Sequence, residues 1–213
     1  MSAALTTRKL ARSATRRAVT RTFLLRNDIV RDDFVRNDKG ATAVEFALVA
    51  APFLALLVAL LQTAMVFFAA RMLDEITEEA SRYVLTGQAQ TANMSASQFR
   101  THVCTGDAVL TKLVSALFTC SKFLISAQSY SNFAAANTND PIAGFNGSNQ
   151  PVDSNGNVLA MPWAPGNPGD IVVLQIMYQW PVVGGPLGFS LSSPNNNGNR
   201  LLMSTAVFKN EPY

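Results

Sequence analysis

The chain has 213 residues, a formal net charge of +3 and 48% hydrophobic residues. The charge is divided unevenly: residues 1–39 hold ten Lys or Arg and four Asp, whereas residues 40–213 hold seven basic and ten acidic residues. The first third is unsuited to a globular core, so the chain has room for one modest folded domain at most.

The N-terminal segment is rich in Arg, Ser and Thr, and residues 1–26 include no acidic side chain. This composition is also typical of mitochondrial transit peptides, although four Asp follow at positions 28 to 38. Nucleic acid is not an expected partner, because no nucleic-acid-binding fold is available to present the arginines. We predict that residues 1–40 are a basic cytoplasmic leader, disordered or loosely helical on the membrane surface.

An apolar stretch follows the leader. Residues 46–70 contain no charged side chain. As a helix it would reach about 37 Å, which exceeds the roughly 30 Å hydrocarbon core of a bilayer. A secretory signal peptide has a shorter apolar region, so we predict a transmembrane helix over residues 41–70. Because basic residues are concentrated before it, the positive-inside rule places the N-terminus in the cytoplasm and the remainder outside.

The spanning helix is expected to continue as an amphipathic extension over residues 71–87. Glu78 and Arg82 form a favourable i, i+4 pair there, and Gly87 is a suitable C-terminal cap. We predict one helix from about residue 42 to residue 86, with its first half in lipid and its second half packed on the outer domain. Apolar residues of the extension recur at three- and four-residue spacing, at Met72, Leu73, Ile76, Ala80, Tyr83 and Val84.

The outer region, residues 88–213, is predicted to be an α+β domain with a short antiparallel sheet packed on the long helix. Its clearest strand places alternate apolar residues on one face and Gln175 and Gln179 on the other. The elements expected along the chain are one or two short helices at 97–118, a strand at 123–133, a long Asn/Gly-rich loop at 134–169, and strands at 170–183 and 201–208.

The two cysteines, Cys104 and Cys120, lie in the region expected outside the membrane. An even number of cysteines in an exported domain usually pairs. An unbroken helix between them would hold them about 24 Å apart, far beyond the roughly 4.4 to 6.8 Å Cα separation of a disulfide. The chain must therefore turn between them if they pair; two buried free thiols are the alternative.

The entrance to the apolar stretch reads K-G-A-T-A-V-E-F-A-L-V at residues 39–49. Gly40 weakens a helix by roughly 1 kcal/mol, so the peptide there can enter a protease cleft in extended form. Glu45 is less costly at the end of a span than at its centre, and the helix dipole favours it, but such a carboxylate usually has a partner.

Residues 40–48, GATAVEFAL, resemble the signal of type IV prepilins and pseudopilins, and most closely the TadE-like branch of the tight-adherence pilus system. The resemblance extends to about Gly87, and more weakly to the outer domain, and implies a pilin-like fold. It also implies cleavage between Gly40 and Ala41 by a prepilin peptidase, after which the Ala41 ammonium would pair with Glu45 of a neighbouring subunit. An interfacial glutamate in an ordinary signal-anchor is the alternative.

This resemblance implies a minor pilin or pseudopilin of the bacterial inner membrane, with its C-terminal domain in the periplasm or, within a pilus, at the cell surface. The implied partners are the prepilin peptidase, other pilins or pseudopilins, the inner-membrane platform of the machine and membrane lipid. Incorporation into the filament and priming of its assembly are both open. The alternatives are an uncleaved signal-anchored extracytoplasmic binding domain and a mitochondrial inner-membrane protein.

Enzymatic function is not expected, since the chain has no P-loop, dinucleotide-binding, H-E-x-x-H or G-x-S-x-G pattern. His102 is the only histidine, and with Cys104 and Cys120 it falls short of a zinc site unless Asp107 joins. We therefore expect no metal and no cofactor. Four large side chains are expected in the core rather than on a ligand-binding surface: Met161, Trp163, Tyr178 and Trp180.

Overall fold

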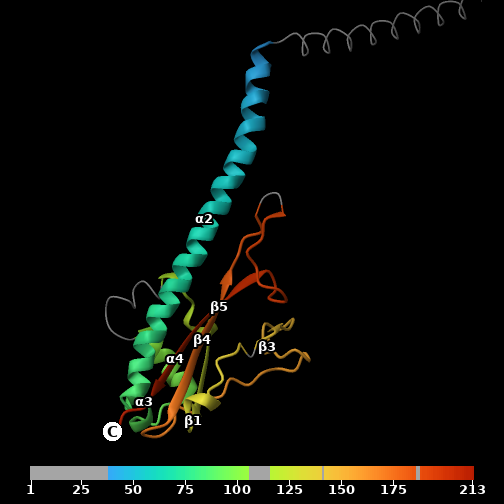
Figure 1. Ribbon diagram of the computed structural model, residues 1–213. Helices are drawn as coiled ribbons and strands as arrows, with labels where there is room; N and C mark the ends of the chain where they lie inside the picture. The colour runs from blue at the N-terminus through green and yellow to red at the C-terminus, as the bar shows by residue number, and fades with distance from the viewer. Residues whose placement is uncertain (1–37, 106–115, 141, 186–187) are drawn as a thin grey trace, which may run out of the picture. The chain divides into compact units, whose positions relative to one another are not determined.

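The computed structural model describes residues 38–105, 116–140, 142–185 and 188–213 (Figure 1). The leader predicted over residues 1–40 lies outside these ranges except for its last three residues. The elements, in chain order, are α2 (Asp38–Leu85), α3 (Gln88–Thr91), α4 (Ala96–Thr105), η1 (Cys120–Lys122), β1 (Phe123–Tyr130), η2 (Phe133–Ala135), β2 (Gly144–Phe145), β3 (Pro151–Val152), β4 (Ile171–Pro181) and β5 (Asn199–Lys209).

The chain divides into two units, Met1–Leu54 and Ala55–Tyr213. The described part of the first unit is the beginning of α2. Its residues 42–49 are all exposed, and they include Val44, Phe46 and Leu48, which are each at least 60% exposed. A helix that exposes apolar side chains all round is stable inside a membrane or a larger assembly rather than in water.

The second unit contains the remainder of α2, and the environment of the helix changes along it. Large apolar residues stay exposed as far as Phe68, whereas from Ala69 onward one side of the helix is buried. The buried positions recur every three or four residues, as expected for one helical face. They are Ala69, Met72, Leu73, Ile76, Thr77, Ala80 and Val84.

The C-terminal end of α2 confirms the predicted cap. The helix ends at Leu85, and Gly87 has a φ of 75°, in the left-handed region that glycine adopts without strain. Its N–H donates to the carbonyl of Val84 at 3.0 Å. At the other end, α2 begins at Asp38, about four residues before the predicted start. The helix itself is therefore confirmed.

The sheet is antiparallel with strand order β1-β4-β5, which confirms the predicted α+β fold. Central strand β4 pairs with both neighbours, and Ile176 lies opposite Ile125 on β1 and Ser204 on β5. Alternate β4 residues join the buried α2 residues in one core, as the sequence pattern predicts. These β4 residues are Val172, Leu174, Ile176 and Tyr178.

The other face of β4 is also buried, which the alternation of polar and apolar residues did not predict. Gln175 donates to the carbonyls of Thr138 and Asn139 at 3.3 and 3.2 Å, and Gln179 donates to Asn196 Oδ1 at 2.7 Å. A second apolar cluster on this face contains Met177, Ile142 and Phe145. The Asn/Gly-rich segment, which includes the short strands β2 and β3, therefore covers the sheet.

The remaining predicted elements are present with different ends. The strand expected at 123–133 ends at Tyr130, and those expected at 170–183 and 201–208 correspond to β4 and β5. The helical region expected at 97–118 begins with α4, which ends at Thr105, and residues 106–115 lie outside the described residues.

Replacing Leu73 by Ala tests the contact between α2 and the sheet. Leu73 is 1% exposed, so Leu73→Ala should lower the free energy of unfolding of the outer domain by about 2–5 kcal/mol. The fluorescence of Trp163 and Trp180 during denaturation of the detergent-solubilised chain would report it. Leu61→Ala, at a position 67% exposed on the same helix, is the matched control and should change little. Equal losses in both variants would contradict the assignment.

Candidate functional site

The predicted processing site lies in the first turn of α2. The helix begins at Asp38, so the peptide bond between Gly40 and Ala41 belongs to its N-terminal end. Gly40 is exposed, and no atom lies within 4 Å of the place where a Cβ would stand. The bond is therefore not covered by other described residues.

Glu45 lies on the same helix, four residues after Ala41. Positions i and i+4 of a helix are neighbours on one face, so the backbone of Ala41 is one turn from Glu45. The Glu45 side chain is exposed among apolar neighbours. The ion pairs among the described residues are Arg71–Asp74 at 3.5 Å and Arg82–Glu78 at 3.2 Å, and neither includes Glu45.

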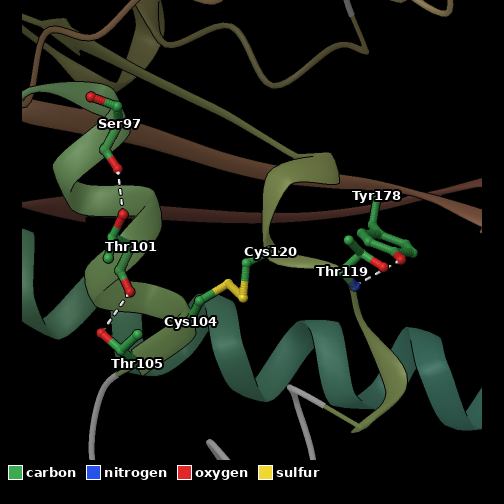
Figure 2. The surroundings of a disulfide bond; sticks show 7 residues. All are labelled: Ser97, Thr101, Cys104, Thr105, Thr119, Cys120 and Tyr178. Carbon is green, nitrogen blue, oxygen red and sulfur yellow. Dashed lines mark hydrogen bonds between the residues drawn. A yellow bond between two sulfur atoms is a disulfide. The ribbon is translucent and has the colours of Figure 1, made fainter.

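The two cysteines form a disulfide in the structure, with their Cα atoms 5.8 Å apart. Cys104 is buried near the end of α4, and Cys120 begins η1, directly before β1 (Figure 2). The N–H of Thr119, next to Cys120, donates to the hydroxyl of Tyr178 at 3.1 Å (Figure 2). The bond therefore joins α4 to the start of β1, and the chain turns between the cysteines.

The four large side chains expected in the core of the outer domain pack against its two apolar clusters. The indole N–H of Trp163 donates to the carbonyl of Met94 at 2.7 Å, and its ring packs on Phe99 with centroids 4.7 Å apart. Trp180 packs against the main core, to which Tyr178 belongs, and Met161 packs against the second cluster. These contacts confirm the predicted role of the four large side chains.

His102 stacks on Tyr83, with ring centroids 4.0 Å apart. Within the part of the chain that the structure describes, no three His, Cys, Asp or Glu side chains come together as a group that could hold a metal ion. The position of His102 is therefore explained by packing against α2.

A groove of about 450 Å³ lies on the face of the sheet that the Asn/Gly-rich segment covers. Ile142, Phe145, Leu201 and Met203 line it, together with the carboxylate of Asp140. Oδ1 of Asp140 already accepts a hydrogen bond from the N–H of Ile142 at 2.8 Å. Ser193 and Asn196 also line the groove, so its surface is mixed in polarity.

The pKa of Asp153, in the same segment, lies below the ordinary value of an aspartate. The main cause is the backbone N–H of Asn157, which donates to Oδ1 at 2.9 Å, and the side-chain amide of Asn157 adds to it. The N–H of Asn155 also donates to Oδ1 at 2.9 Å. These hydrogen bonds stabilise the ionised carboxylate, which lowers its pKa. They also tie Asp153 to Asn155 and Asn157, so the carboxylate closes a turn.

These features define a class of protein in which one helix has an exposed apolar half and a second half that forms the core of a disulfide-linked α+β domain. Of the helices described, α2 is long and apolar enough to cross a membrane, and its most apolar 18-residue window within Thr42–Leu85 has a mean hydropathy of 2.5. Residues 40–82 match the model of the TadE-like protein family, which confirms the resemblance carried by GATAVEFAL. No curated protein and no solved structure matches the chain.

The family match lies wholly within α2 and ends before the outer domain. It fits a membrane protein associated with a tight-adherence pilus. The weaker resemblance expected over the outer domain stays a prediction. The matched segment contains Gly40, Ala41 and Glu45, whose roles the match does not itself assign.

Removing both cysteines tests the contribution of the disulfide. The chain-entropy model gives about 3 kcal/mol for closing a loop of this size, so the Cys104→Ser, Cys120→Ser double variant should lose about that much stability. Tryptophan fluorescence during denaturation would measure the loss. Reductant should destabilise the wild-type chain and leave the double variant unchanged. Two free thiols in the mass of the non-reduced exported domain would contradict the assignment.

Proposed function

We propose that this protein is a minor pilin or pseudopilin of a bacterial tight-adherence pilus machine, and that it acts in assembly rather than in catalysis. The carrying observation is the GATAVEFAL string, which stands between a basic leader and an exposed apolar helix within the segment that matches the TadE-like family. The basic leader favours a cytoplasmic N-terminus in the inner membrane and a periplasmic outer domain.

The first step of this function is cleavage after Gly40 by a prepilin peptidase. Two observations support it: Gly40 is exposed with open space around it, and it presents no side chain to a protease cleft. Cleavage removes the leader and leaves the charged ammonium of Ala41 at the start of the apolar helix.

The second step is pairing between subunits. An ionised carboxylate in a membrane segment is costly without a partner, and Glu45 is exposed among apolar side chains. The Ala41 ammonium of a neighbouring, processed subunit supplies the opposite charge. Pairing Glu45 with this amine would fix the axial offset between two α2 helices, and the other pilins and the inner-membrane platform would supply the remaining contacts.

Processing is tested at the N-terminus of the protein extracted from membranes. With an active peptidase, the sequence should begin at Ala41, and the leader should remain attached in cells that lack the enzyme. Gly40→Val should also retain the leader, because a β-branched side chain obstructs the protease cleft that the bare Gly40 backbone can enter. An intact Met1 in wild-type cells would refute cleavage.

Pairing is tested by replacing Glu45. Glu45→Ala should reduce pilus assembly roughly tenfold or more while membrane insertion continues, because breaking a desolvated ion pair costs about 3–5 kcal/mol. Glu79→Ala removes an exposed carboxylate further along α2 and is the matched control. Immunoblots of sheared pili and of membranes separate the two effects. Normal assembly with Glu45→Ala would favour the uncleaved signal-anchored binding domain instead.

A further inference from the structure

The connection between β4 and β5 contacts the apolar part of α2. Gln62 lies within the charge-free stretch of the helix, and its Nε2 donates to the carbonyl of Val183, two residues after β4, at 2.6 Å. Figure 1 shows this connection rising from the sheet beside α2. A segment of the outer domain therefore lies against the helix well before the first charged residue after the apolar stretch, Arg71.

The position of this contact along α2 can be compared with the thickness of a bilayer. Gln62 precedes Arg71 by nine residues, which corresponds to about 13 Å of helix. About 20 apolar residues cross the hydrocarbon core, so a span that begins at Phe46 ends near Met65. With a span placed this way, Gln62 and the carbonyl of Val183 lie within one helical turn of the end of the hydrocarbon core.

The described residues of the connection suit that level. Residues 182–185 and 188–198 carry no charged side chain, and Val183 is 77% exposed, more than any other large apolar residue described for the outer domain. Phe189 on the same connection is 38% exposed, and on α2 Leu61, next to Gln62, is 67% exposed.

We infer that the connection around Val183 inserts into the headgroup–acyl boundary of the lipid leaflet on the side of the outer domain. We assign lipid as the partner of Val183 because Val183 contacts α2 within its apolar stretch. Lipid that surrounds α2 at Gln62 therefore also surrounds Val183. Insertion is shallow, since irregular backbone with free N–H and carbonyl groups is excluded from the hydrocarbon interior. The inference rests on α2 crossing the membrane and is independent of cleavage and pairing.

A fluorescent label at position 183 tests this insertion. Both native cysteines are joined in a disulfide, so Val183→Cys supplies the reactive thiol for an NBD label on the full chain in phosphatidylcholine vesicles. Leu56→Cys, in the exposed apolar part of α2, is the reference for lipid contact. Val158→Cys is the matched control, since Val158 is 55% exposed but lies in the Asn/Gly-rich segment.

The expected result is a blue-shifted emission at position 183 and quenching by spin-labelled lipid at least about twice that at position 158, strongest with a quencher near the headgroups. A label at 56 should be quenched most by a quencher deep in the acyl chains. Quenching at 56 without quenching at 183, or equal quenching at 183 and 158, would overturn the inference. Absence of quenching at 56 would instead refute the membrane span, and with it the anchored function.

Discussion

The packing of one face of α2 against β4 is the contact on which the outer domain depends. From Ala69 to Val84 the helix buries small and aliphatic residues every third or fourth position, and these meet alternate residues of the central strand. Burial of apolar surface is the main favourable term in folding, and a domain of this size has few other elements that can bury apolar surface. The C-terminal half of α2, from Ala69 to Val84, is therefore also the centre of the core.

The other features of the domain follow from this arrangement. Central strand β4 is buried on both faces, by α2 on one and by the Asn/Gly-rich segment on the other, which places its glutamines under cover with hydrogen-bond partners. The disulfide from Cys104 to Cys120 fixes α4 to the start of β1. The core of the domain, its disulfide and the cover over β4 all lie within the unit Ala55–Tyr213.

The helix, the order of the strands along the chain and the core aromatics could be predicted from the sequence because each leaves a periodic or compositional signal. The stripe through Leu73 and Ile76 repeats with the helical period, and the alternation along β4 repeats with the period of a strand. The cover over Gln175 could not be predicted, because side chains of an Asn/Gly-rich loop show no period. The contact between Gln62 and Val183 joins residues 121 positions apart, and no local pattern specifies it. The roles of Gly40 and Glu45 were predicted from the GATAVEFAL string alone. The structure adds that both residues are exposed.

Water-soluble maleimide reacting with cysteines placed along α2 would test the central claim, that one helix passes from lipid into the core of the outer domain. Glu75→Cys and Glu79→Cys should react in intact membranes with the outer face accessible, because both positions are exposed. Cysteines at Leu56 and Leu60 should react only after detergent removes the lipid, and those at Leu73 and Ile76 only after denaturation. Reaction at Leu73 and Ile76 in the native protein, or at Leu56 in intact membranes, would contradict it.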